Sequence, residues 1–213
     1  MLFQLALDAP FTQDSLPAIL EAAPYLDIIE IGTPAVYAMG MQSVRMLRKA
    51  LPNAVLLADL KIADAGEYET QIALDAGADI VTVLASAADE TVLGAVKAAR
   101  ACGKRISADL IGVPDPLGRA ARIEEMGVDI LCAHTGLDRQ QADGAPFALC
   151  KALLAQRKTA QIAVAGGITT RTIPLLADVP ADICIVGGGI TKCASLQEGT
   201  LAIRQAYRAS QNN

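Results

Sequence analysis

The chain has 213 residues, of which 53% are hydrophobic, and a formal net charge of −5. These values predict one folded domain over residues 1–213, exclude an intrinsically disordered chain, and argue against a general nucleic-acid surface. No basic segment precedes the first apolar run, and no run approaches the ~18 residues of a membrane span. Five cysteines without CxxC spacing predict buried free thiols. We therefore expect a cytoplasmic protein with no membrane partner.

Eight short apolar runs alternate with longer segments along the chain. The predicted strands are 2–7, 27–31, 54–60, 79–84, 105–110, 129–134, 161–166 and 182–187. Two segments between them, 67–78 and 90–103, repeat their apolar residues at helical spacing. Gly77 and Gly103 stand where a helix C-cap is expected. Strands that alternate with helices predict a parallel sheet.

A weak internal repeat supports this count. An Asp-Ile pair begins four of the predicted strands, at Asp27, Asp79, Asp129 and Asp182, with spacings of 52, 50 and 53 residues. Each interval holds two strand–helix units, so the repeat predicts eight units. Eight units in a chain of this length most simply close into a (β/α)8 TIM barrel, with an open doubly wound sheet as the alternative. We interpret these Asp side chains as solvent-facing.

Ionisable side chains gather at the carboxyl ends of the predicted strands, where (β/α)8 barrels carry their active sites. Five of the eight strands end in such a group. Charged groups are rarely buried unless they form ion pairs or take part in binding or catalysis, so this pattern favours an enzyme. The groups are Asp8, Glu30, Asp59 with Lys61, Asp109 and His134.

Several of these groups also have a structural interpretation. Asp8 can cap a turn, and His134, the only histidine, can be a satisfied core residue. Asp59 and Lys61 share one face of a strand and can form an ion pair, which is a weak stabiliser when it is buried. Glu30 lies on the same strand face as apolar neighbours, so it needs a partner.

Asp64 opens the segment that follows the third strand. Together with Glu67 it matches the capping-box pattern at the start of a helix. Taken alone, Asp64 is therefore better explained as a helix cap than as a catalytic residue.

Glycine-rich segments follow the last two strands. Gly166-Gly167 and Gly187-Gly188-Gly189 each stand between a strand and a predicted helix. Glycine lets the backbone approach a ligand closely, and a helix N-terminus favours an anion. Barrels often bind phosphate with the loops after strands 7 and 8, so these segments predict a phosphorylated substrate. Tight turns without a ligand are the alternative.

Residues 59–64, DLKIAD, resemble the D-x-K-x-x-D signature of the orotidine monophosphate decarboxylase suprafamily. Segments from QLALD at 4–8 to IVGGGIT at 185–191 closely resemble its 3-hexulose-6-phosphate synthase branch. The related 3-keto-L-gulonate 6-phosphate decarboxylases carry an Arg at the positions where this chain has Leu137 and Gly188. The resemblance covers essentially the whole chain.

The resemblance implies an aldol condensation of formaldehyde with D-ribulose 5-phosphate, which gives D-arabino-hex-3-ulose 6-phosphate. Glu30 and Asp59 would hold Mg2+, with Mn2+ also possible, because hard carboxylate oxygens suit these ions. His134 would act as the base, and Lys61 would stabilise the developing oxyanion. A 3-keto-L-gulonate 6-phosphate decarboxylase and a non-catalytic sugar-phosphate-binding barrel are the alternatives.

The resemblance also implies a homodimer, in which Asp64 reaches the active site of the neighbouring subunit. The remaining implied contacts are to the sugar phosphate. They involve Asp8 and Asp109 at the hydroxyl groups and Gly166, Gly167, Gly187 and Gly188 at the phosphate.

Overall fold

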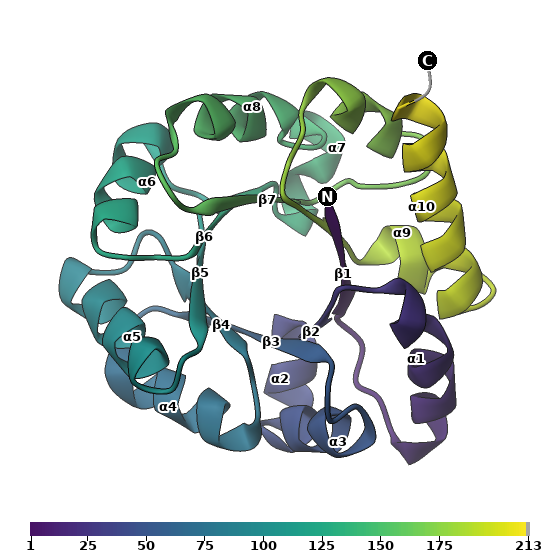
Figure 1. The fold of residues 1–213 in the computed structure, drawn as a ribbon, viewed down its shortest axis with the longest axis horizontal. Coiled ribbons are helices and arrows are strands. Elements are labelled where there is room, and N and C mark those ends of the chain that lie inside the picture. The colour runs from purple at the N-terminus through teal and green to yellow at the C-terminus, as the bar shows by residue number, and fades with distance from the viewer. Residues whose placement is uncertain (212–213) are drawn as a thin grey trace.

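The computed structural model describes residues 1–211, which form a closed barrel of eight parallel strands (Figure 1). The last strand pairs with the first, so the predicted (β/α)8 barrel is confirmed and the open sheet is excluded. Each predicted strand is present, with ends that differ by at most two residues. The strands are β1 Leu2–Leu7, β2 Ile28–Ile31, β3 Val55–Ile62, β4 Ile80–Leu84, β5 Arg105–Asp109, β6 Ile130–His134, β7 Gln161–Ala165 and β8 Ile183–Val186.

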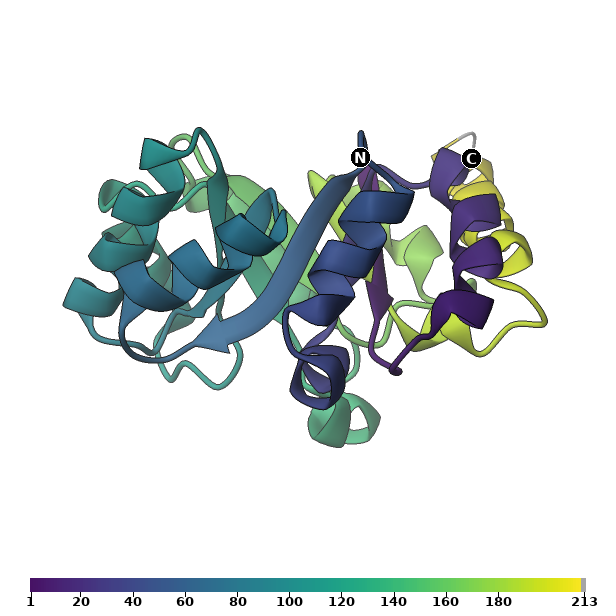
Figure 2. The same ribbon diagram turned by 90° about the horizontal axis from the view of Figure 1, so that it is seen from below.

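Helices form a ring around the barrel, and the short helix α7 projects beyond it (Figure 2). Among residues 1–211, every helix is too short or too polar to cross a lipid bilayer. The α-helices are α1 Leu16–Ala22, α2 Thr33–Met39, α3 Gln42–Ala50, α4 Gly66–Ala76, α5 Asp89–Ala101, α6 Pro116–Glu125, α7 Gln140–Asp143, α8 Phe147–Gln156, α9 Gly188–Thr191 and α10 Leu196–Gln211. Short 3-10 helices are η1 Gln13–Ser15, η2 Ala23–Tyr25, η3 Leu137–Arg139 and η4 Ile173–Asp178.

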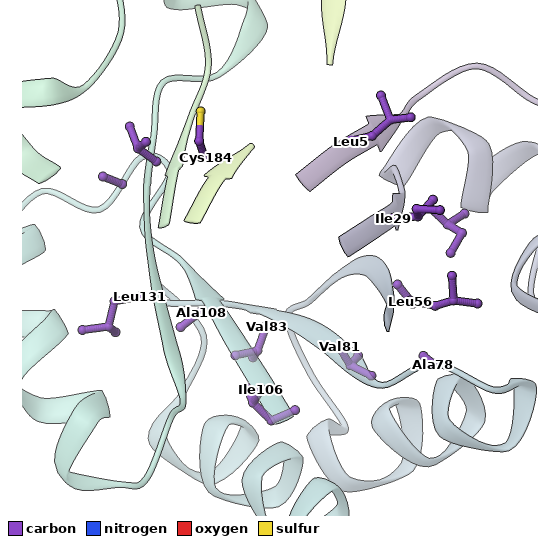
Figure 3. Close-up of a cluster of buried hydrophobic side chains, with 14 of the residues drawn as sticks. Leu5, Ile29, Leu56, Ala78, Val81, Val83, Ile106, Ala108, Leu131 and Cys184 are labelled. Atoms are coloured by element: carbon purple, nitrogen blue, oxygen red, sulfur yellow. The ribbon is translucent and has the colours of Figure 1, made fainter. Parts of the chain in front are cut away.

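Strand alternation divides the apolar side chains into two layers. The larger layer lies between the strands and the helices, and Figure 3 shows part of it, including Leu5, Leu56 and Ile106. The smaller layer fills the barrel interior with Ile28, Leu57, Ile80, Ile130, Cys132, Ala163, Ala165 and Ile183. Because this inner layer fills the barrel below the carboxyl ends of the strands, the polar groups at those ends lie directly above apolar side chains.

The four Asp residues of the repeat hold the strands together at their amino ends. Each Asp accepts a hydrogen bond from the second residue of the preceding odd-numbered strand, at 2.7–2.9 Å, and its own N–H donates back to that residue's carbonyl. The solvent-facing interpretation was therefore incomplete: Asp27 is exposed and the other three are half-buried, and all four carboxylates also satisfy backbone donors at the barrel rim. The pairs are Asp27 with Phe3, Asp79 with Leu56, Asp129 with Ile106 and Asp182 with Ile162.

The expected glycine caps are present, but the expected capping box is not. Gly77 ends α4 with a φ of +108°, and Gly103 follows α5 with a φ of +65°. At the start of α4, Ala65 is the N-cap with a φ of +49°, and no side chain of the described residues caps the helix. Asp64 instead accepts the N–H of Ala65 at 2.8 Å, because the left-handed turn directs the chain away from the geometry that a capping box needs.

The cysteine expectation holds in part. All five thiols are free, and Cys132, Cys150 and Cys184 are buried. Cys102 and Cys193 are exposed, so burial does not extend to the whole set.

We expect Asp129→Ala to lower the free energy of unfolding by about 1–2 kcal/mol, because it leaves the Ile106 N–H without its acceptor. Urea unfolding followed by circular dichroism measures the change. Exposed Asp14 provides the control substitution, Asp14→Ala, for which we expect a change below about 0.5 kcal/mol. Equal stabilities of the two variants would contradict a structural role for the repeat.

Candidate functional site

A cavity of about 680 Å3 opens at the carboxyl ends of the strands. It brings together ten of the predicted site residues, which come from seven of the eight strands and the loops that follow them. Those lining the cavity are Asp8, Glu30, Asp59, Lys61, Asp109, His134, Gly166, Gly167, Gly187 and Gly188.

Lys61 lies at the centre of a charged network across one side of the cavity. Its Nζ lies 3.0 Å from Asp59 Oδ2 and 2.8 Å from Asp109 Oδ2. The same Asp109 oxygen lies 2.8 Å from His134 Nδ1. Three strands, β3, β5 and β6, therefore contribute one connected chain of four ionisable groups.

The charges of this network shift its pKa values. Burial alone would lower the pKa of Lys61, but the adjacent carboxylates of Asp59 and Asp109 raise it. Burial acts in the opposite direction on Asp109, where the hydrogen bond and charge of His134, followed by Lys61, lower the pKa to about 2. The ammonium and the Asp109 carboxylate therefore both stay charged at neutral pH.

Two threonines that the sequence analysis missed hold the buried carboxylate of Asp59. Thr33 Oγ1 donates to Asp59 Oδ2 at 2.7 Å, and Thr82 Oγ1 donates to Asp59 Oδ1 at 2.7 Å. Thr82 lies two residues after Ile80 on β4, and Ile80 faces the barrel interior. Strand alternation therefore predicts that Thr82 also faces the interior. Thr33 begins α2, and nothing in the local sequence marks it.

Glu30 is buried on β2, and its only hydrogen-bond donor within residues 1–211 is Gln4 of β1. Gln4 Nε2 donates to Glu30 Oε2 at 2.5 Å. Burial and then the negative charge of Asp59 raise the pKa of Glu30 to about 8, although the Gln4 bond opposes the rise. The signal for Gln4, a polar residue inside the apolar run of β1, was present in the sequence and was missed.

Glu30 and Asp59 form a carboxylate pair on adjacent strands. Within residues 1–211 there is no group of three or more His, Cys, Asp or Glu side chains arranged to hold a metal ion. Two carboxylates nevertheless fit Mg2+, which usually takes one or two of them and completes its shell with substrate and water. Burial and then the repulsion from Asp59 raise the pKa of Glu30, and a bound cation would relieve this repulsion.

Asp8 lies at the opposite side of the cavity mouth, against two glycines. A Cβ atom on Gly32 would lie 2.2 Å from Asp8 Oδ1, and one on Gly187 would lie 3.2 Å from Asp8 Oδ2. Desolvation and then the charge of Asp59 raise the pKa of Asp8. The carboxylate therefore faces the cavity, and it accepts no turn-capping hydrogen bond within residues 1–211.

The loop after β7 requires glycine. Gly166 and Gly167 have φ values of +94° and +70°, and a Cβ on Gly166 would lie 2.1 Å from the carbonyl oxygen of Thr135. The tight turn and the cavity lining are thus the same feature, because the turn brings backbone to the cavity surface.

Lys192 is a further residue that lines the cavity. A Cβ on Gly188 would lie 3.7 Å from Lys192 Nζ, so the ammonium lies over the glycine segment after β8. No motif spacing could have shown this, because the side chain folds back along the short helix α9.

Asp64 is the one predicted site residue that the cavity of its own chain does not contain. It is exposed and bonds only to the Ala65 N–H among the described residues. Leu137 lies at the cavity mouth with an exposed fraction of 78%.

The model of the orotidine 5'-phosphate decarboxylase / HUMPS family matches residues 1–202. The chain is 41% identical to the 3-hexulose-6-phosphate synthase of Bacillus subtilis strain 168 over 205 residues, which cover 96% of this chain and 98% of that one. The crystal structure of 3-hexulose-6-phosphate synthase from Salmonella typhimurium superposes with a TM-score of 0.93 and 36% identity, covering 99% and 100% of the two chains. 3-Keto-L-gulonate-6-phosphate decarboxylase from Vibrio cholerae superposes with a TM-score of 0.83 and 26% identity, covering 98% and 97%. The chain therefore belongs to the orotidine 5'-phosphate decarboxylase / HUMPS family.

Proposed function

We propose that this enzyme catalyses the reversible aldol condensation of formaldehyde with D-ribulose 5-phosphate to D-arabino-hex-3-ulose 6-phosphate. One observation carries the proposal. The linked Lys61–Asp109–His134 network faces the buried carboxylates Glu30 and Asp59 in a single cavity. The similarity to proteins named 3-hexulose-6-phosphate synthase supports this choice of reaction.

Proton transfer would fall to His134. Its Nδ1 faces Asp109, which leaves Nε2 as the nitrogen free to take a proton from C1 of the bound ketose. The resulting carbanion at C1 attacks the formaldehyde carbon and forms the new carbon–carbon bond. The proton held by His134 then returns to the oxygen of the former aldehyde, so the side chain ends the cycle as it began.

Negative charge that develops on the ketose oxygen would be balanced by the Lys61 ammonium. Asp59 and Asp109 fix that ammonium on two sides, so little reorganisation is needed as charge develops. Mg2+ held by Glu30 and Asp59, with Mn2+ as the alternative ion, would supply Lewis-acid stabilisation of the same charge.

The other end of the cavity would receive the substrate phosphate. Backbone of Gly166, Gly167, Gly187 and Gly188 lines this end, and Lys192 adds a positive charge beside it. Asp8, across the mouth, is placed to orient a sugar hydroxyl.

The enzyme would work as a homodimer with a shared site. Asp64 lies outside the cavity of its own chain, immediately after the strand that carries Lys61. The flanking helices α2 and α4 expose Tyr37 and Tyr68 at 82% and 72%, which are apolar surfaces that a second copy would cover. Cytoplasmic formaldehyde fixation in a ribulose monophosphate pathway is part of the same proposal.

Decarboxylation of 3-keto-L-gulonate 6-phosphate fits this site less well. Leu137 and Gly188 stand where that branch carries arginines, and both positions line the cavity. A barrel that only binds a sugar phosphate does not need the complete charged network.

The reaction is tested by formaldehyde consumption with ribulose 5-phosphate and Mg2+, measured beside CO2 release from 3-keto-L-gulonate 6-phosphate. We expect fast formaldehyde loss that EDTA abolishes, and slow CO2 release. In Glu30→Gln we expect the Mg2+ concentration for half-maximal activity to rise at least about 10-fold, because one carboxylate ligand is lost. Fast CO2 release with little formaldehyde uptake would instead identify a decarboxylase.

Lys192→Ala should raise the KM for ribulose 5-phosphate about 10- to 100-fold at nearly constant kcat. The physical reason is the loss of one charged hydrogen bond to phosphate, which contributes about 1.5–3 kcal/mol. Lys151→Ala, on the exposed face of α8, is the matched control and should keep the wild-type KM. An unchanged KM in Lys192→Ala would remove this residue from the phosphate site.

Mixing two inactive variants tests the shared site. Lys61→Ala with Asp64→Ala should recover about a quarter of wild-type activity, because half of the randomly formed dimers would each hold one intact site. Lys61→Ala with His134→Ala is the control, since both changes lie in the same barrel and no intact site forms. No recovery in the first mixture, with subunit exchange verified by mass spectrometry, would place Asp64 outside a shared site.

A further inference from the structure

The strand that carries Lys61 is irregular beside the cavity. Three residues of β3, 59–61, lie opposite a single residue of β4, Thr82. Two residues of extended chain span about 6–7 Å, so this bulge sets how far along the barrel axis Lys61 lies. The pairs that flank the bulge are Ala58 with Val81 and Ile62 with Val83.

The backbone of Lys61 adopts an uncommon conformation in this bulge. Its φ is +48°, and Ala65 is the only other non-glycine residue with a positive φ among residues 1–211. This left-handed region is uncommon for residues with a side chain, so surrounding contacts must maintain it. The bulge also removes the regular ladder partner of the Lys61 N–H, which donates instead to Thr82 Oγ1 at 2.9 Å.

The Thr82 hydroxyl uses both of its hydrogen-bonding functions here. It accepts from the Lys61 N–H and donates to Asp59 Oδ1 at 2.7 Å. The same Asp59 oxygen accepts from Lys61 Nζ at 3.2 Å. One hydroxyl therefore closes a ring that joins the backbone of Lys61, its ammonium and the carboxylate of Asp59. Thr82 is 6% exposed, which leaves water little access to replace it.

We propose that Thr82 is a positioning residue that holds Lys61 in the bulge, so that its ammonium reaches Asp59 and Asp109 together. Without the hydroxyl, the Lys61 N–H regains a partner only if β3 and β4 return to a regular ladder. That change would move Lys61 about 6–7 Å along the strand, which is incompatible with the 2.8 Å contact to Asp109.

Thr33 provides an internal comparison, because it contacts Asp59 without contacting Lys61. Its hydroxyl donates to Asp59 Oδ2 and to the Asp59 carbonyl oxygen. Thr33→Val should therefore disturb the carboxylate but leave the bulge in place, whereas Thr82→Val should disturb both.

The kinetic test rests on the proposed aldol reaction and uses the Mg2+-loaded enzyme. Thr82→Val preserves side-chain shape and should lower kcat about 10- to 100-fold, with the KM for ribulose 5-phosphate changed less than about threefold. Thr82→Ser restores the hydroxyl and should return kcat to within about threefold of wild type. Thr70→Val is the matched control, because the Thr70 hydroxyl is also buried but has no hydrogen-bond partner within residues 1–211. It should keep the wild-type kcat.

A second measurement is independent of the reaction catalysed. Lysine acetylation by N-hydroxysuccinimide acetate, mapped by mass spectrometry, should be faster at Lys61 in Thr82→Val than in wild type, Thr33→Val and Thr82→Ser. Thr82→Ala serves the same comparison if the valine variant fails to fold.

Unchanged Lys61 acetylation after loss of the Thr82 hydroxyl would overturn the proposal, whatever happens to kcat. Faster acetylation in a protein whose wild type consumes no formaldehyde would support the positioning role and reject the proposed reaction. The two conclusions can therefore fail separately.

Discussion

The structure depends first on the reciprocal hydrogen bonds between four Asp residues and the amino ends of the odd-numbered strands. In each pair the carboxylate accepts one backbone N–H and the Asp N–H returns a bond to the same residue, as between Asp129 and Ile106. Such a pair fixes the register of two neighbouring strands at one end. Since the register then propagates along the strands, it also decides which residues arrive together at the other end. The rim that stabilises the barrel and the rim that carries the cavity are thus opposite ends of the same strands.

The cavity concentrates negative charge over an apolar floor. Glu30, Asp59 and Asp109 are buried there, and Lys61 is the cation that contacts two of them. Among the described residues, the third carboxylate, Glu30, accepts only from the amide of Gln4, and burial and the charge of Asp59 raise its pKa to about 8. An arrangement that leaves one carboxylate uncompensated stabilises the fold poorly. It suits a site in which a divalent cation and a polar substrate supply the missing partners.

Positioning in this site comes from irregular backbone as much as from side chains. The left-handed turn at Gly166 brings backbone to the cavity wall, and the left-handed bulge at Lys61 sets the position of the ammonium. Glycine adopts its positive φ without strain, whereas the positive φ of Lys61 is local strain that the neighbouring strand must hold. At Lys61 this holding contact comes from Thr82, because its hydroxyl accepts a hydrogen bond from the Lys61 N–H and donates one to Asp59. A regular barrel strand could present the same residues without bringing them into contact.

The sequence by itself determined the eight strands, the barrel and most of the residues that line its mouth. Strand alternation, the Asp repeat and the position of charged residues at strand ends are local patterns, and local patterns are readable along one chain. Only the tertiary structure decided which side chains form hydrogen bonds with the site carboxylates. The bonds from Thr33 and Thr82 to Asp59 join residues 26 and 23 positions apart, and the one from Gln4 to Glu30 spans 26. The tertiary structure also placed a left-handed turn at Ala65 where a capping box at Asp64 was expected. It gave the Asp repeat its structural role as well. Those outcomes depend on which segments meet when the barrel closes: the sequence shows the repeated Asp residues and the strand alternation, but it does not show which backbone or side-chain group each of them bonds.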